Sequence, residues 1–228
     1  MIPIVKKAEP KALSRAKRDI KNTPDATFSF SSLRGDDKNE VLKALVQEQG
    51  YLCAYCMCRI DAKGNQATIE HLEPQHPMNE ESDGELSLAY ENMVAVCGGR
   101  NGATCDKHRG NTPLTVNPTK PNTLDSIVYR RDGIIDAGDK AIRHDLQETL
   151  GLNSPLTNLC ANRAAAMREI ERQIGSAIRR KKIERNTDAK KTLCLKVLRY
   201  YEQQGDKKDE YLGAKLFKAK KLVAKFAD

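Results

Sequence analysis

Five of the seven cysteines lie between residues 51 and 111, and this stretch most restricts how the chain can fold. Two form the short pair Cys53-Ala-Tyr-Cys56, and Cys97 and Cys105 follow, separated by a glycine-rich loop. A Cys-x-x-Cys turn points two thiolates at one metal ion, and zinc takes four such ligands in a tetrahedron. We therefore predict a structural Zn²⁺ site made of these four cysteines. Cys58 is left out because it should point away from the turn. Buried, reduced thiols without a metal are the alternative.

The composition of the chain indicates the compartment in which the protein works and the kind of partner it binds. The odd number of cysteines argues against a disulfide framework. The first residues lack the apolar core of a signal peptide, and no run approaches the roughly 18 apolar residues of a membrane span. We expect a cytoplasmic protein without a membrane partner. The formal net charge of +8 favours a polyanionic partner, with DNA the first candidate and a merely soluble basic protein the alternative.

An acid–histidine dipeptide lies between the two cysteine pairs. Glu70 and His71 end a short predicted strand, and Pro74 then breaks regular structure. A carboxylate suits a hard cation such as Mg²⁺ or Mn²⁺, and a neutral histidine, with an ordinary pKa near 6.5, suits a general base. Hydrolysis of a phosphodiester needs both a base for water and a cation for the phosphate and the leaving oxygen. Alone, Glu-His is more often a surface pair. Inside the cysteine bracket it indicates a catalytic site.

Taken together, these motifs resemble those of the HNH endonucleases. The resemblance is carried by the Cys53 pair, Glu70-His71-x-x-Pro74, Asn92, and the Cys97 and Cys105 pair followed by a basic cluster. More narrowly, the chain resembles HNH proteins encoded beside retrons and the PtuB-type HNH subunit of Septu antiphage systems. The features behind this narrower match are Cys-Ala-Tyr-Cys, Ile-Glu-His, Tyr90-Glu-Asn92 and the run from Cys105 to Asn111. They cover about a quarter of the chain.

The resemblance implies a role for each matching residue. His71 would be the general base that activates water, and Glu70 would hold the catalytic Mg²⁺ or Mn²⁺. Asn92 would fix the loop that orients the base. For the third position of the motif His108 is favoured as a second metal ligand, with Asp106 a close rival and Asn111 a further option. The resemblance also implies that Lys107 and Arg109 contact phosphate oxygens. His76, in an acidic loop, and His144, in a predicted helix, are expected to have no catalytic role.

The expected function is therefore metal-dependent hydrolysis of DNA. The resemblance further implies the nuclease subunit of a bacterial antiphage complex whose ATPase is a separate chain, and no nucleotide-binding loop occurs in this sequence. Cleavage of RNA stays open, because HNH chemistry does not read the sugar. The alternative is a zinc-stapled DNA-binding or assembly module without catalysis.

The rest of the chain predicts an α+β protein in which a ββα-metal (HNH) core with a structural zinc precedes a mainly helical C-terminal region. Residues 1–35 are predicted to form an arm that packs on the main domain or on a partner, with a short helix near 11–20. Residues 36–120 would be the nuclease domain, opening with a helix that Gly50 ends. Residues 121–228 would hold a β-hairpin around Arg131-Asp-Gly and helices near 139–149, 155–182, 187–204 and 207–226. Core candidates in this region include Leu156, Leu159, Ile170 and Ile174. Its basic clusters, 179–182 and 218–221, suit either DNA backbone contacts or a solvated helix face.

Overall fold

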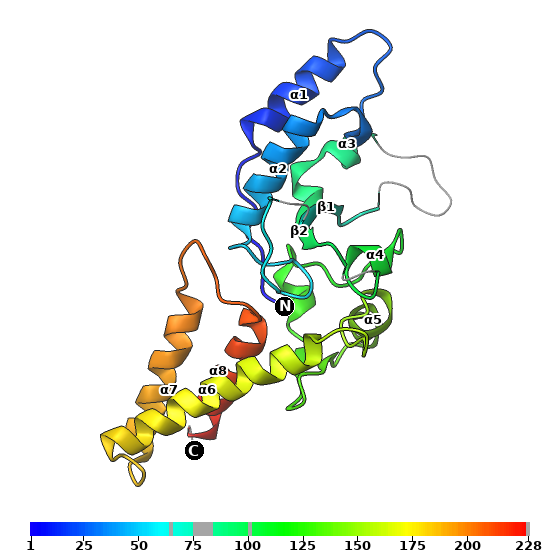
Figure 1. Ribbon diagram of the computed structural model, residues 1–228. Coiled ribbons are helices and arrows are strands. Elements are labelled where there is room, and N and C mark those ends of the chain that lie inside the picture. Colours follow the sequence, from blue (N-terminus) through cyan, green and yellow to red (C-terminus); the bar gives the residue numbers. More distant parts are fainter. Residues whose placement is uncertain (64–65, 75–83, 100–101, 227–228) are drawn as a thin grey trace.

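The computed structural model describes residues 1–63, 66–74, 84–99 and 102–226, and its class is α+β, as predicted. Long helices and two separate two-stranded sheets make up the chain (Figure 1). No helix in these described ranges is long and apolar enough to cross a membrane. His76 lies outside the described residues.

The N-terminal arm packs on the part of the chain that follows it. Helices α1 (Lys11–Lys21) and α2 (Gly35–Glu48) lie side by side (Figure 1), and Leu13 is fully buried between them and the core. Lys6 anchors the extended start of the arm. Its Nζ is 2.7 Å from Glu48 Oε1 and donates to the Met93 carbonyl at 2.9 Å. Both predicted helices are confirmed. The arm packs on the rest of the chain, which is one of the two arrangements considered for it.

The central sheet pairs β1 (Ala67–His71) with β2 (Met93–Cys97) in antiparallel register, and Glu70 lies opposite Val94. Every residue of β2 is buried, because α2 covers this strand. The segment between the strands includes the short helix α3 (Gly84–Leu88) and a 3₁₀ turn (Tyr90–Asn92). The four-residue helix α4 (Asp106–Arg109) follows β2. The sheet thus holds Cys97 and the Glu-His dipeptide, and Cys105 directly precedes α4.

The C-terminal region begins with the predicted hairpin. A 3₁₀ turn (Pro121–Leu124) leads into it, and its strands, β3 (Ile127–Tyr129) and β4 (Ile135–Ala137), pair antiparallel. Helix α5 (Lys140–His144) continues into a π-helical turn (Asp145–Thr149), matching the helix predicted near 139–149. Three longer helices complete the chain: α6 (Leu159–Lys181), α7 (Thr187–Glu202) and α8 (Leu212–Lys225).

Two predicted helix starts in this region are wrong. Helix α6 begins at Leu159 instead of near Pro155, because residues 151–157 form consecutive turns, and Leu156 is 84% exposed and not in the core. Helix α8 begins at Leu212 instead of near residue 207. The residues before it form bends and turns that are hydrogen-bonded to the segment around the cysteine turn: Lys208 N donates to Gly50 O at 3.1 Å and Tyr211 N to Met57 O at 3.0 Å.

The described residues form two hydrophobic cores, and the cysteine turn contributes to both. The larger core includes Cys53 and Cys56 together with residues of α1, α2, the central sheet and the hairpin. The smaller one lies among α6, α7 and α8 and contains Leu52 and Met57 from the same turn. The turn therefore joins the three C-terminal helices (residues 159–225) to the rest of the protein.

Candidate metal centre and adjacent polar pocket

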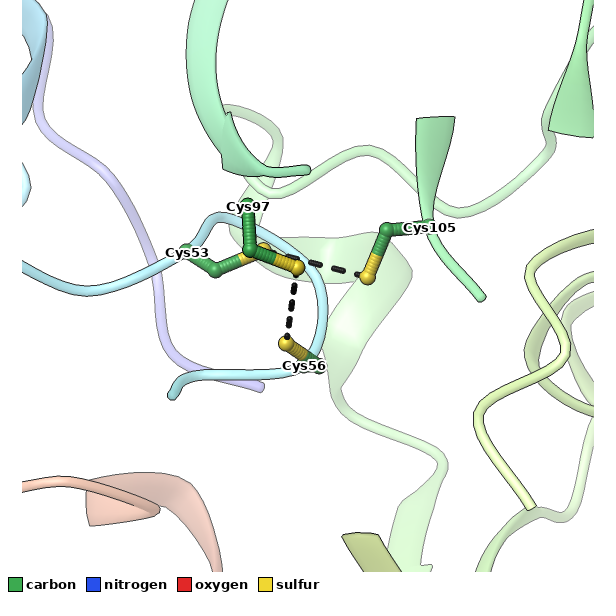
Figure 2. Close-up of side chains that lie close together, drawn as sticks. All are labelled: Cys53, Cys56, Cys97 and Cys105. Atoms are coloured by element: carbon green, nitrogen blue, oxygen red, sulfur yellow. Dashed lines mark hydrogen bonds between the residues drawn. The ribbon is translucent and has the colours of Figure 1, made fainter. Parts of the chain in front are cut away.

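Four cysteine sulfurs meet at one buried point, as the sequence predicted. Cys53 and Cys56 lie on the turn after α2, Cys97 is the last residue of β2, and Cys105 directly precedes α4. Figure 2 shows the four side chains converging from these separate segments. All four sulfurs lie within 4.8 Å of one another.

The spacing of these sulfurs fits zinc. A Zn–S distance of about 2.3 Å in a tetrahedron places neighbouring sulfurs about 3.8 Å apart. The Sγ–Sγ distances are 3.9 Å between Cys53 and Cys105 and 3.7 Å between Cys56 and Cys97. A disulfide would bring two sulfurs to about 2.05 Å, so the four cysteines are not paired in this way. The arrangement can hold a metal ion such as zinc in an all-sulfur site.

The expectation for Cys58 was only partly right. Cys58 is not one of the four converging residues, in agreement with its omission. It does not point away, however, because its Sγ lies 3.3 Å from that of Cys56 and the side chain is buried. The tight turn, in which Cys53 N donates to Cys58 O at 3.0 Å, returns this residue to the cluster. A fifth thiol therefore touches the candidate zinc site.

A polar pocket of about 250 Å³ lies where β1 ends, at the opposite end of the sheet from Cys97. Glu70 and His71, the last residues of β1, line it together with Asp106 at the start of α4. Asn111, just beyond α4, also lines it. Two residues on adjacent strand positions reach one pocket because β1 ends at His71 and the chain turns towards Pro74. The structure thus brings together three of the predicted site residues and the optional Asn111.

His71 is held in one orientation from two sides. Its Nε2 lies 2.8 Å from the Ser87 carbonyl, and the ring of Phe30 meets the imidazole edge-on with the centroids 4.8 Å apart. A neutral ring that donates from Nε2 carries its lone pair on Nδ1. Burial lowers the pKa of His71 below its ordinary value, although the hydrogen bond to Ser87 acts in the opposite direction. This environment favours the neutral imidazole that a base requires.

Glu70 is a buried carboxylate in a crowded polar setting. Its Oε1 forms an ion pair with the Arg109 guanidinium and accepts from the Tyr55 hydroxyl at 3.1 Å. Burial raises the pKa of Glu70 to about 7; Arg109 opposes this rise and the neighbouring Asp106 carboxylate adds to it. Two carboxylates on one pocket are a typical donor set for a hard divalent cation.

Asn92 joins the turn that follows β1 to the segment whose Ser87 carbonyl contacts His71. Its Oδ1 accepts from Glu73 N at 2.8 Å, and its Nδ2 donates to the carbonyls of Glu73 at 3.1 Å and Leu86 at 3.2 Å. Glu73 belongs to the turn after β1, whereas Leu86 precedes Ser87, whose carbonyl holds the His71 ring. The loop-fixing position predicted for Asn92 agrees with these contacts.

His108, the favoured second metal ligand, does not lie with the other predicted ligands. Its ring nitrogens face backbone carbonyls, Nδ1 that of Gly102 at 3.2 Å and Nε2 that of Glu148 at 3.0 Å, and the side chain does not line the pocket. On α4 the pocket-facing position belongs to Asp106, because His108 lies two residues further round the helix. His144 is exposed at the end of α5 and is also not among the pocket residues.

Arg109 was also misassigned. The predicted phosphate contact is incompatible with its burial, since its side chain is only 1% exposed. The guanidinium donates to three carbonyls besides Glu70, those of His71 at 2.9 Å, Leu72 at 2.7 Å and Thr112 at 2.7 Å. Arg109 therefore fixes the end of β1. Lys107, by contrast, is exposed on the same short helix, as a phosphate contact would require.

Two residues at this site were not singled out from the sequence. Tyr55 lies inside the Cys-x-x-Cys turn and links it to Glu70 through its hydroxyl. Ser87 orients His71 through its backbone, and a backbone carbonyl leaves no signal in the residue type. Comparison with known families gives no support in either direction: no family model matches the chain, and no curated protein matches it.

Proposed function

We propose that the protein is a metal-dependent HNH endonuclease that hydrolyses phosphodiester bonds in DNA. The observation that carries this proposal is the shared pocket of Glu70, His71 and Asp106, which lies next to the four-cysteine cluster. In this reading β1, β2 and α4 form a ββα-metal core, and zinc in the cluster fixes the ends of β2 and α4. A purely structural zinc module has no need for a buried base and two carboxylates at one pocket.

His71 is the general base of the proposed reaction. The imidazole, which is oriented by the contact of Nε2 with the Ser87 carbonyl, accepts a proton from water in this reaction. Its lowered pKa keeps the ring neutral near pH 7. Asn92 and Phe30 keep the ring in place, Asn92 through the flanking chain and Phe30 by direct contact. Lys107, exposed beside the pocket, is placed to meet a phosphate oxygen.

Glu70 and Asp106 would hold the catalytic Mg²⁺ or Mn²⁺, with the Asn111 side chain as a third oxygen donor. The donor set fits a hard cation, because each residue offers oxygen and the two carboxylates repel one another when both are ionised. A cation there would stabilise charge on the phosphate and on the leaving oxygen. Arg109 holds Glu70 in place through Oε1 and supplies part of the neutralising charge.

The sequence resemblance also suggests a biological role and a partner protein. We include in it a role as nuclease subunit of a Septu-like antiphage complex, with the ATPase on a separate chain. The support is the sequence resemblance together with the lack of a nucleotide-binding loop in this chain.

One observation favours the second candidate, a zinc-stapled DNA-binding or assembly module without catalysis. Glu70 Oε1 is already occupied by Arg109 and Tyr55, both buried, as in an ion pair with a structural role. Such a pair stabilises the end of β1 whether or not a second cation binds.

Plasmid nicking separates the two candidates. Wild type and His71→Ala are incubated with supercoiled DNA and Mg²⁺ or Mn²⁺, with and without the ATPase chain, and zinc is counted in each sample. The enzyme reading expects His71→Ala to lower the rate about 10²- to 10⁴-fold at unchanged zinc content. His144→Ala, an exposed histidine away from the pocket, should cut like wild type. Equal cutting by wild type and His71→Ala, or no cutting under any of these conditions, would favour the binding module. A parallel single-stranded RNA substrate tests the choice of sugar.

A further inference from the structure

The positive charge of the protein is concentrated in the three C-terminal helices. Residues 159–225 contain 19 Lys and Arg against 8 Asp and Glu, a formal charge of +11. The whole chain carries +8, so the remaining residues, which include the proposed nuclease site, sum to −3. A polyanion attracted by the net charge would therefore meet these helices before it met the pocket.

An exposed aromatic ring lies on this basic surface. Tyr200, near the end of α7, is 62% exposed, whereas its neighbour Tyr201 is 3% exposed and belongs to the smaller core. The two rings meet edge-on with centroids 5.0 Å apart. Tyr201 thus supports a ring that leaves much of its surface to solvent. Tyrosine is enriched at binding interfaces, because its ring is apolar and its hydroxyl is polar.

Tyr200 separates two adjoining hollows. One, of about 380 Å³, is lined by Tyr200 with Lys196, Val197 and Lys215, and the other, of about 290 Å³, by Tyr200 with Gln203 and Lys207 among others. Asp209 lines both, and its carboxylate is ion-paired with Lys215 at 2.7 Å. Lys196, one helical turn before Tyr200, and Lys207, in the following loop, therefore place positive charge on either side of the ring.

We propose that Tyr200 is a stacking platform for a base of single-stranded nucleic acid, with Lys196 and Lys207 contacting the flanking phosphates. An aromatic face with cations on both sides matches the alternation of base and phosphate along a single strand. A duplex keeps its bases stacked on one another and cannot offer a face to one side chain. DNA and RNA present the same faces and phosphates, so both sugars are tested below.

The platform is tied to the candidate zinc site. Arg59, just after the cysteine turn, donates from its backbone N–H to Glu210 Oε1 at 2.8 Å and from Nη2 to Lys208 O at 2.5 Å. Tyr211 N donates to Met57 O at 3.0 Å. The loop that lines one hollow is thus fastened to the turn that holds Cys53 and Cys56. As a strand holder for the nuclease, the platform rests on the proposed function, but strand binding itself does not require cleavage.

Binding is measured by fluorescence anisotropy without divalent cation, using labelled dT20, U20 and a 20-base-pair duplex. We expect Tyr200→Ala to weaken dT20 binding about 5- to 150-fold, the effect of losing one base–aromatic stack. Tyr200→Phe, which keeps the ring, should restore affinity to within about twofold. Lys196→Gln and Lys207→Gln should each lower the salt slope by about 0.7. The matched control is Leu156→Ala, since Leu156 is 84% exposed but lies outside the hollows.

The proposal fails if Tyr200→Ala binds dT20 and U20 as wild type does, or if its affinity for the duplex falls by as much. It also fails if polyglutamate displaces dT20 equally well from wild type and from Tyr200→Ala. The surface would then suit an acidic protein partner. An oligonucleotide carrying 5-iodouracil gives an independent measurement, because illumination should crosslink it to Tyr200 in wild type. Cleavage retained in His71→Ala, with dT20 binding lost in Tyr200→Ala, would overturn the proposed function and leave the platform standing. Cleavage lost in His71→Ala, with dT20 binding unchanged in Tyr200→Ala, would overturn the platform alone.

Discussion

The Arg109 guanidinium and the Glu70 carboxylate form an ion pair in the protein interior, between α4 and the end of β1. The side chain of Arg109 is 1% exposed and that of Glu70 is 8% exposed, so water solvates neither charged group to a large extent. The two cysteine segments and the end of β1 are joined by this pair, because Tyr55 from the cysteine turn donates to the same Glu70 oxygen. The pair therefore connects the candidate metal centre with the polar pocket.

Replacing Arg109 with Met should strongly destabilise the fold. The change leaves a buried carboxylate and three backbone carbonyls without their donor, and removing one member of a buried pair costs about 3–5 kcal/mol. Denaturant unfolding measures the free energy. The control is Lys107→Met, which removes an exposed cation from the same helix and should cost less than about 1 kcal/mol.

A double variant sharpens this prediction. Adding Glu70→Gln to Arg109→Met removes the stranded charge and should recover part of the loss. If Arg109→Met costs no more than Lys107→Met, the ion pair does not stabilise the end of β1.

Stability without added Mg²⁺ or Mn²⁺ should fall as the pH rises through 7, in part because of Glu70. Its pKa is about 7 in the folded protein against an ordinary value of 4.5, so the folded state binds the proton more tightly. This contribution is fully present below pH 4.5 and is lost as the pH rises through 7. The shift corresponds to about 3 kcal/mol.

Glu70→Gln has no such titration, so the comparison isolates this group. Between pH 5 and pH 8, wild type should lose about 3 kcal/mol more of its unfolding free energy than Glu70→Gln does. Glu40→Gln, at an exposed carboxylate on α2, should follow wild type. Parallel curves for wild type and Glu70→Gln would mean that Glu70 does not titrate in this range.

The cysteine cluster could be predicted because two of its ligands lie three residues apart in the sequence. A Cys-x-x-Cys turn fixes two sulfurs by itself, and the antiparallel pairing of β1 with β2 returns Cys97 to it. Glu70 and His71 were likewise found because they end a recognisable strand. Helix α2 followed from apolar periodicity and from Gly50 at its end, and helices α1 and α7 lie close to their predicted ranges.

Residues whose roles depend on packing were misjudged. Arg109 lies in a basic run four residues after Cys105, and only the folded position of Glu70 shows that the Arg109 charge points inward. The choice between Asp106 and His108 depended on the orientation of a four-residue helix, which residue order does not fix. The start of α8 was missed because tertiary hydrogen bonds to Gly50 and Met57 override the local helical preference of residues 207–211.

Zinc content should distinguish the four converging cysteines from Cys58. Cys97→Ser should lower bound zinc from one per chain towards zero after dialysis against a weak chelator, because a hydroxyl is a poor replacement for thiolate. Cys58→Ser should keep one zinc, since Cys58 lies beside the cluster but outside the set of four. A loss of zinc in Cys58→Ser equal to that in Cys97→Ser would place Cys58 among the ligands.

Removing zinc should also loosen the C-terminal helices. The amides of Lys208 and Tyr211 donate to carbonyls of the cysteine turn, at Gly50 and Met57. Hydrogen exchange at these two amides should speed up in Cys97→Ser. The amide of Ile135, which donates to Asn153 within the hairpin region, provides an internal reference that should change little.

The proposed role of Asp106 as second metal ligand predicts opposite results for Asp106 and His108. Asp106 lines the pocket with Glu70, so Asp106→Asn should lower the nicking rate at fixed Mg²⁺ by at least about tenfold, with added metal restoring part of it. His108→Gln should change the rate by less than about threefold, because its ring faces the carbonyls of Gly102 and Glu148 and supplies nothing to the pocket. Nicking at several Mg²⁺ concentrations measures both effects, and equal zinc content shows that the fold is retained. A large loss in His108→Gln with an unaffected Asp106→Asn would mean that α4 turns its other face to the metal when DNA binds.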